Sequence, residues 1–288
     1  TKNLLDLSVG RGGDLRHWLD ANVNMLVGID VSKDGLSDTN GVCNRVLTES
    51  GKPGKEDIAK NYLMIWADTS KNITDGTGAP DDLYRYYLNI LYGNLDIKQV
   101  KNAKLRRFHN LGNAAITDSG FDVVSSQFSL HYYFKNEDTI NIFLNNVSRS
   151  LKSGGKFIGT CLDGGRVFDM FEGSPNNYVE HSVGDNLCWK IIKRFTLGMF
   201  PPSEVSLGQE IDVFNESIGA TFTEYLVNFE YFELLCSKYN LKKVDVGSFG
   251  DIFDGLSVDN KKYGKLNDMT TDLKRYSFLN NYFVYEKV

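Results

Sequence analysis

The 288-residue chain carries 32 Lys and Arg against 37 Asp and Glu, a formal net charge of −5, and 41% of its residues are hydrophobic. This composition is typical of a folded globular protein and excludes the disordered and collagen-like classes. The negative balance argues against a protein that grips nucleic acid mainly through phosphate charge, and no apolar run reaches the roughly 20 residues of a membrane-spanning helix. The four Cys form no C-x-x-C pair, so neither a disulfide framework nor a zinc site is expected and a reducing compartment is favoured.

The first 165 residues alternate between short apolar runs and helical patterns. Strands are predicted at residues 3–7, 25–29, 62–67, 121–126 and 156–161. Helices are predicted at residues 13–19, from a Ser32 N-cap to about residue 47, in two patterns within 81–108, and at 137–151. The glycines of residues 153–155 are expected to end the last helix. This alternation predicts a parallel α/β sheet.

Beyond residue 165 the alternation fades. Residues 184–195 and 210–227 are predicted as β-rich excursions, 228–239 as a helix, and 241–249 and 277–285 as strands. Since no repeat or low-complexity linker interrupts the chain, we expect one domain over residues 1–288 with an inserted region. The chain begins without Met on a core strand, so a fragment of a longer polypeptide is expected.

The first candidate site is the turn SVGRGGD at residues 8–14, between the first strand and its helix. Glycine permits positive φ and close approach of a ligand, and the amides of a helix N-terminus follow. The pattern is not the dinucleotide fingerprint G-x-G-x-x-G, and Asp14 would repel a pyrophosphate but could pair with an amino group. An ordinary tight β–α turn is the alternative.

Acidic residues also end the second and third strands. Asp30 could accept hydrogen bonds from both hydroxyls of an adenosine ribose, and Asp68 could accept one from an adenine amino group. Taken singly, Asp30 is explained as well by a helix cap and Asp68 by a loop cap. Together with Asp14, they predict a nucleoside pocket without phosphates.

The segment QFSLHYYF at residues 127–134 follows the fourth strand, where loops commonly carry function. Its aromatic side chains could wall a flat ring, and His131 could donate to one. A core aromatic cluster around a hydrogen-bonded histidine is the alternative.

Seven segments in order resemble the mRNA cap guanine-N7 methyltransferases: LDLSVGRGGDL (5–15), VGID (27–30), AD (67–68), SQFSLHY (126–132), GGKFIGT (154–160), FTEYLV (222–227) and KYNL (238–241). The Q-F-x-x-H-Y segment and the late E-Y-L-V distinguish this family from other methyltransferases. The insert is most similar to the C-terminal methyltransferase domain of multifunctional capping enzymes of large cytoplasmic DNA viruses. There, triphosphatase and guanylyltransferase domains precede it, which would explain the abrupt start.

The resemblance implies a class I, Rossmann-like S-adenosylmethionine-dependent fold with a mostly parallel central sheet, helices on both faces and β-rich insertions in the C-terminal half. Residues 1–165 would bind the cofactor and 166–288 the cap guanine. The enzyme would methylate guanine N7 of the 5′ GpppN cap and release S-adenosylhomocysteine. Its partners would be capped RNA and the two upstream domains, in the cytoplasm or a viral factory, with no metal, membrane or secretion signal. A stimulatory subunit is left open.

Cofactor-binding roles follow from the same resemblance, with Arg11 where the family usually has Lys and Val9 where Cys is common. The residues implied are Ser8, Gly10, Arg11 (methionine carboxylate), Asp14 (ammonium), Asp30 (ribose), Asp68 (adenine), Gln127 and Phe128 (floor near the methionine). For the cap guanine they are His131, Tyr132, Glu224 and Tyr282, with Tyr285 competing for the last place. No acid, base or nucleophile is expected, because N7 is an unprotonated lone pair.

Three other functions fit parts of the pattern. A small-molecule or RNA methyltransferase of the same fold would share the glycine turn, and a degenerate stimulatory subunit would share the fold but lose the cofactor acids. A nucleotide-dependent oxidoreductase is disfavoured, because the glycine turn lacks G-x-G-x-x-G and carries Asp14. A basic cluster at residues 101–107 could guide RNA phosphates, or form a solvated helix face.

Overall fold

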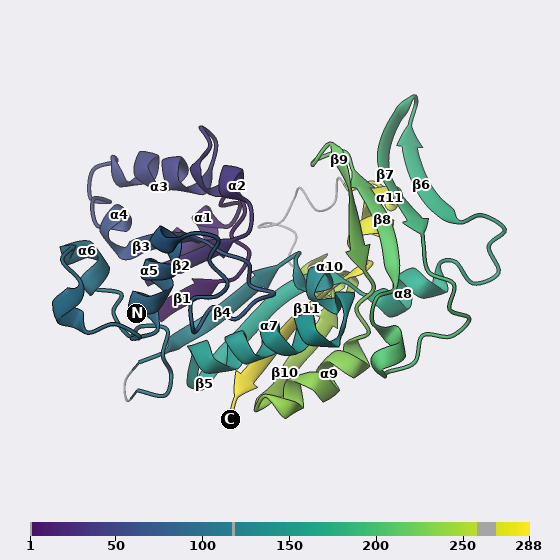
Figure 1. Cartoon of the computed structure of the whole chain (residues 1–288). Helices are drawn as coiled ribbons and strands as arrows, with labels where there is room; N and C mark the ends of the chain where they lie inside the picture. Colours follow the sequence, from purple (N-terminus) through teal and green to yellow (C-terminus); the bar gives the residue numbers. More distant parts are fainter. Residues whose placement is uncertain (1, 117–118, 258–268) are drawn as a thin grey trace.

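The computed structural model describes residues 2–116, 119–257 and 269–288 (Figure 1). In these ranges a seven-stranded sheet has the order β10–β11–β5–β4–β1–β2–β3. The strands are β10 (Leu241–Ser248), β11 (Asn280–Lys287), β5 (Leu151–Leu162), β4 (Phe121–Gln127), β1 (Lys2–Asp6), β2 (Val23–Asp30) and β3 (Tyr62–Trp66). From β5 to β3 the strands are parallel, and β11 is antiparallel to both neighbours. The predicted, mostly parallel sheet is confirmed.

Helices cover both faces of this sheet, because alternate side chains of its strands point to opposite sides. Leu5 and Val27 pack in one buried cluster with α5 (Asp82–Leu91), α7 (Glu137–Ser150) and α9 (Phe229–Lys238). Their neighbours Leu4 and Leu26 pack in another cluster with α1 (Leu15–Asp20), α2 (Lys33–Ser37) and α3 (Val42–Ser50). Shorter elements are α4 (Ile58–Asn61), η1 (Ile97–Gln99), α6 (Ala103–Arg106) and η2 (Leu130–Lys135).

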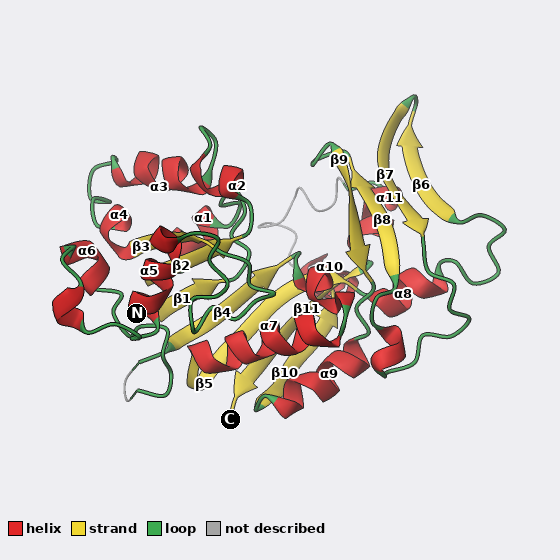
Figure 2. Cartoon of the chain, in the orientation of Figure 1, coloured by secondary structure: helices red, strands yellow, loops and turns green. Residues whose placement is uncertain are grey.

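A second, four-stranded antiparallel sheet stands beside the first (Figure 2). It comprises β6 (Tyr178–Val183), β7 (Asn186–Lys193), β8 (Glu210–Asn215) and β9 (Ala220–Tyr225). Trp189, Ile191, Ile211 and Val213 bury its inner face in a third cluster that includes Val167 of α8 (Gly164–Asp169). The remaining elements are η3 (Glu204–Ser206), α10 (Phe249–Ser257) and α11 (Thr271–Ser277). The predicted β-rich C-terminal half is confirmed.

Two predicted boundaries were wrong for backbone reasons. Ser32 does cap a helix, accepting from Gly35 N at 3.0 Å, but α2 ends at Ser37. Gly41 then packs so tightly that a Cβ would lie 2.8 Å from Leu36 O, and α3 starts after it. The second boundary concerns residues 153–155, which do not end a helix: α7 stops at Ser150 and these residues lie inside β5, with Gly154 at φ +74°.

The elements that were not predicted include α4, α8, β6, α10 and α11. Residues 271–277 are helical, so the strand predicted from residue 277 starts at Asn280. The four Cys are free. In the three described ranges no helix is both long enough and apolar enough to cross a membrane.

Candidate functional site

The parallel strands β1, β2, β3 and β4 end at one edge of the sheet, and the predicted cofactor residues follow those ends. Gly10 N donates to Asp30 Oδ2 at 2.7 Å, which ties the glycine turn to the end of β2. Gly10 has φ +51°, and no atom lies within 4 Å of the place where a Cβ would sit. Such an open, left-handed turn lets a ligand approach the backbone closely.

Asp30 uses both carboxylate oxygens locally. Besides the bond from Gly10, its Oδ1 accepts from Ser32 N at 2.7 Å. Ser32, rather than Asp30, is the cap of α2. Because each carboxylate oxygen has two acceptor sites, Asp30 keeps capacity for further donors such as ribose hydroxyls.

Asp6, at the end of β1, was not singled out from the sequence. Its carboxyl is buried and accepts from Ser8 N at 3.1 Å. Burial, with smaller contributions from the charges of Asp14 and Asp30, raises the pKa of Asp6 to about 7 despite that bond. Three acidic groups therefore converge around the turn, an arrangement suited to a cationic or hydroxyl-rich ligand. Asp14 also contacts His17 Nδ1 at 3.2 Å.

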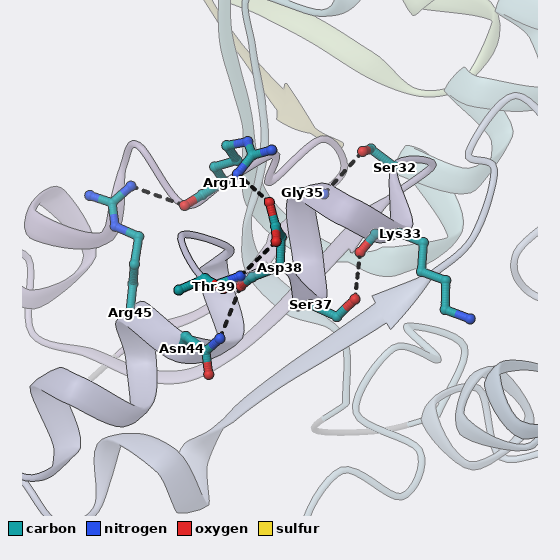
Figure 3. A network of polar contacts seen from close by, with 9 residues as sticks. All are labelled: Arg11, Ser32, Lys33, Gly35, Ser37, Asp38, Thr39, Asn44 and Arg45. Atoms are coloured by element: carbon teal, nitrogen blue, oxygen red, sulfur yellow. Dashed lines mark hydrogen bonds and ion pairs between the residues drawn. The ribbon is translucent and has the colours of Figure 1, made fainter.

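Arg11 lies beside Asp38, the residue that follows α2 (Figure 3). Its Nη1 lies 3.2 Å from Asp38 Oδ2, and both side chains are half exposed. Arg45 donates to Arg11 O at 3.0 Å, which fixes the backbone of the turn. A contact of Arg11 with a ligand carboxylate would compete with Asp38, and the assignment of that role stays a prediction.

Asp68 caps its own loop: its Oδ1 accepts from Ser70 N at 3.0 Å and from Ser70 Oγ at 2.6 Å. Its Oδ2 lies 3.5 Å from Lys71 Nζ. The loop-capping interpretation is thus correct as far as it goes, and a contact with an adenine amino group stays a prediction.

The end of β4 is held by hydroxyl and amide groups. Gln127 Nε2 donates to Ser125 Oγ at 3.0 Å and its Oε1 accepts from Thr160 Oγ1 at 2.9 Å. Ser8 Oγ joins Ser129 Oγ, which links the glycine turn to this segment. Phe128 has φ +49° and is 55% exposed, a strained, outward-facing aromatic at the site.

A cavity of about 610 Å³ opens beside Phe128, between η2, the β8–β9 hairpin and the C-terminal helices. Its walls come from segments far apart in the sequence: Phe128, His131, Tyr132, Leu162, Asn215, Ser217, Ile218, Phe222, Glu224, Phe249, Met269, Leu273, Tyr276, Ser277 and Asn280. Three of the four predicted guanine-binding residues therefore share one cavity. Few polar groups on an apolar wall are typical of small-molecule sites.

His131 and Glu224 face each other in this cavity, with Nδ1 and Oε2 3.6 Å apart. Burial lowers the pKa of His131 to about 3 and raises the pKa of Glu224 to about 7. The contact is therefore a neutral imidazole beside a carboxyl group, not an ion pair. Neither ring nitrogen of His131 has a hydrogen-bond partner among the described residues, which excludes the alternative of a hydrogen-bonded core histidine.

Tyr132 is 45% exposed and packs edge-on against the His131 ring, with centroids 4.2 Å apart. The next aromatics, Tyr133 and Phe134, are buried in the main core. The segment thus divides into a cavity wall and a core anchor.

The predicted late aromatic, Tyr282, is not among the residues that line this cavity, and its hydroxyl donates to Asp245 at 3.0 Å. It lies on β11 opposite Thr160 of β5. Its competitor Tyr285 is fully buried against Phe232 and Phe283. A contact of Tyr282 with guanine stays a prediction.

Tyr276 of α11 lines the cavity instead. Burial raises the pKa of its hydroxyl, the Asn215 side chain bonds to it, and the Glu224 charge acts on it. Sequence reasoning missed Tyr276 because residues 271–277 were not predicted as a helix. Only Thr270, which accepts from Leu273 N as an N-cap, signals that helix.

Comparisons with known proteins identify the family and the fold of the chain. The sequence model of the mRNA (guanine-N(7))-methyltransferase domain matches residues 102–279, more than half of the chain. The chain belongs to this family. Its relatives include a probable mRNA-capping enzyme of Acanthamoeba polyphaga mimivirus, 26% identical over 99% of the chain and 25% of that protein. Another is an mRNA cap guanine-N(7) methyltransferase of Candida albicans, 30% identical over 99% of the chain and 58% of that protein.

The chain thus spans well under two thirds of the length of these relatives of the cap-methyltransferase family. Among solved structures, the CcbJ methyltransferase of Streptomyces caelestis superposes with a TM-score of 0.51 at 14% identity, over 100% of this chain and 84% of that one. The fold is that of the class I S-adenosylmethionine-dependent methyltransferases, as predicted.

Proposed function

We propose that the chain transfers the methyl group of S-adenosylmethionine to N7 of the cap guanine of mRNA. The observation that carries the proposal is the contact of His131 with Glu224 in a cavity beside the strand ends, where neither ring nitrogen of the buried His131 has a hydrogen-bond partner among the described residues. Family membership and the names of the relatives support the same reaction.

Guanine fits the two polar groups of the cavity. The carboxylate of Glu224 accepts from the N1 and N2 hydrogens of guanine, a pair of donors that adenine does not offer. The neutral ring of His131 has one N–H donor, which suits the neighbouring carbonyl oxygen of the base. The exposed ring of Tyr132 offers a flat wall.

The turn and the strand ends fit S-adenosylmethionine. We assign its ribose to Asp30, its ammonium to Asp14 with the buried Asp6 behind, and its adenine to Asp68. Ser8, Gly10, Arg11, Gln127 and Phe128 are assigned to the methionine side. When bound, the cofactor supplies an already activated methyl group.

Because guanine N7 carries a lone pair at neutral pH, the protein needs no general base for the transfer. Glu224, His131 and Tyr132 fix the base, and the acids at the strand ends fix the other ligand. Holding two reactants in line contributes roughly 7–11 kcal/mol in well-aligned systems. The side chains of this site therefore act by positioning, and we assign none as a nucleophile, base or metal ligand.

The wider assembly is proposed by analogy with the mimivirus relative, whose name is that of a capping enzyme. We propose that residues 1–165 bind the cofactor, that 166–288 bind the cap, and that the chain works within a longer capping protein with triphosphatase and guanylyltransferase activities in the cytoplasm.

The test is methyl transfer from labelled S-adenosylmethionine to GpppA, with ApppA as the matched control. We expect label in GpppA alone, at guanine N7. Label in neither dinucleotide, while S-adenosylmethionine still binds, would favour a stimulatory methyltransferase-like subunit. Equal labelling of both would point to a different acceptor atom and overturn the assignment of Glu224.

A further inference from the structure

The cavity extends beyond the His131–Glu224 pair to an apolar rim formed by the β8–β9 hairpin. Phe222 on β9 is 44% exposed and Ile218 in the hairpin turn is 66% exposed, and both line the cavity. Single exposed apolar residues are ordinary on protein surfaces. Two of them on the wall of a cavity that also holds unpaired buried polar groups mark a surface that a ligand covers.

Phe222 and Glu224 lie two residues apart on the same face of β9. Their side chains are therefore spaced by roughly 7 Å along the strand. Thr223, between these two residues, points to the opposite face of β9, where its Oγ1 donates to Asp212 Oδ1 at 2.9 Å. A flat group that lies next to a base held by Glu224 would therefore lie over the Phe222 ring.

The rim is held in place by its own turn. Asn215 Oδ1 accepts from Ser217 N at 2.9 Å and from Ser217 Oγ at 2.7 Å, and Gly219 takes φ +72°. The Asn215 side chain also bonds to Tyr276 on the far wall. The turn and the opposite helix are thus joined across the cavity.

The chemistry of the rim selects its occupant. No Lys or Arg is among the described residues that line the cavity, so this lining offers no cationic side chain to a phosphate. An exposed aromatic ring flanked by an aliphatic side chain offers a stacking platform to a nucleobase. In a capped RNA the group tethered next to the guanine is the first transcribed nucleoside.

We infer that the base of the first transcribed nucleotide stacks on Phe222, with Ile218 against its edge, while the cap guanine is held by Glu224. This inference rests on the proposed function and adds a second base subsite to it. Because stacking uses the face of the base and not its edges, the subsite accepts any of the four bases.

Calorimetric binding of GTP and GpppA, with S-adenosylhomocysteine present, tests the inference. GTP carries the guanine and the phosphates but no second nucleoside. We expect wild-type protein to bind GpppA about tenfold more tightly than GTP. In Phe222→Ala the two dissociation constants should come within about twofold, with that of GTP unchanged. The change in the ratio on substitution isolates stacking from the difference in phosphate charge.

Two further variants control the comparison. Phe222→Trp, which keeps a stacking ring, should retain the preference for GpppA and guards against misfolding of the alanine variant. Val183→Ala removes an apolar residue of the same sheet that is 62% exposed and does not line the cavity, and it should change neither constant. GpppG and GpppC should bind within a few-fold of GpppA.

Equal binding of GTP and GpppA by wild-type protein would overturn the inference. So would an equal loss for both ligands in Phe222→Ala, since Phe222 would then contact the guanine. If neither GTP nor GpppA binds wild-type protein that still binds S-adenosylhomocysteine, the proposed function falls, and the subsite with it.

Discussion

Glu224 and His131 do not hydrogen-bond to each other, and both have groups that can hydrogen-bond to a guanine base. A buried polar group without a hydrogen bond costs about 1–3 kcal/mol of folding free energy. Both ring nitrogens of His131 are buried without a hydrogen bond, and burial of Glu224 raises the pKa of its carboxyl group. Since neither residue stabilises the free protein, a ligand that donates to one and pairs with the other recovers the deficit on binding.

Replacing Glu224 tests this directly. Glu224→Ala should lower kcat/KM for GpppA by at least about 100-fold, because two hydrogen bonds to a charged acceptor are lost. The affinity for S-adenosylmethionine, measured by calorimetry, should stay within about threefold, since Glu224 lies outside the glycine turn. Glu224→Gln keeps the shape but presents a donor to guanine N1, so it should be nearly as impaired. Loss of both ligands, or of neither, would contradict the assigned role.

The pKa of Glu224 predicts how guanine binding varies with pH. Guanine donors stabilise the carboxylate, so binding requires its ionised form. Below about pH 7 the affinity for GTP should fall by up to tenfold per pH unit, and above pH 7 it should level off. His131 stays neutral over this range, because its pKa is about 3.

Titration calorimetry between about pH 5.5 and 8 measures this dependence. Asp6 also has a pKa of about 7, so Glu224→Gln is the matched control: whatever pH dependence it retains belongs to other groups. A wild-type affinity that is flat across this range would contradict the prediction.

Replacing Asp30 tests the proposed cofactor site separately from the proposed guanine site. Asp30→Ala should abolish detectable binding of S-adenosylmethionine, because it removes the acceptor for ribose hydroxyls and also releases Gly10 N and Ser32 N. Asp30→Asn keeps one acceptor oxygen for the turn and should weaken binding less. GTP binding should remain in both variants. Retained cofactor affinity in Asp30→Ala would refute the assignment.

The sequence predicted the cavity residues that stand in recognisable motifs, and it missed those that only the tertiary structure places at the cavity. His131, Tyr132 and Glu224 stand in recognisable segments, and they share a cavity. Tyr276 stands in none, and it reaches the cavity only because α11 packs against the second sheet through Trp189. Tyr282 is not among the residues that line the cavity, and its hydroxyl bonds to Asp245, so its contact with guanine stays a prediction.

Elements with strong periodicity were predictable, and those defined by a single backbone position were not. β1 to β5, α7 and α9 follow long apolar patterns. The division of the Ser32 helix depends on one tightly packed glycine, Gly41, whose effect no periodicity reveals. α10 contacts β10 and β11, and of α11 only the N-cap Thr270 gave a local signal.

Gly159 in β5 provides a test at this scale. A Cβ there would overlap Ser126 O of β4 and the Phe283 ring of β11. Gly159→Ala should therefore lower the free energy of unfolding by about 3 kcal/mol or more, seen as a large drop in Tm. Gly13→Ala is the matched control, because nothing lies within 4 Å of its Cβ, and it should change Tm little. Equal Tm values would mean that β5 shifts without cost.

Across the whole molecule, charge and binding sites are separated. The basic residues of the 101–107 cluster lie around α6, at the opposite end of the molecule from β9 and the cavity (Figure 1). One of them is engaged locally, because Arg106 Nε donates to Val100 O. A solvated, structural face explains this cluster better than a path for RNA.

A chain of net charge −5 with the proposed cap and first-base subsites should gain little affinity from more RNA. We expect the KM for a capped 20-nucleotide RNA to lie within about threefold of that for GpppA. The slope of log Kd against log salt should be shallow, below about 2 in magnitude, since each neutralised phosphate of a single strand contributes roughly 0.7. Lys101→Glu with Arg107→Glu should leave both values unchanged. A steep slope that these substitutions abolish would instead make α6 part of the RNA path, with the transcript crossing the whole sheet from the cavity to that end.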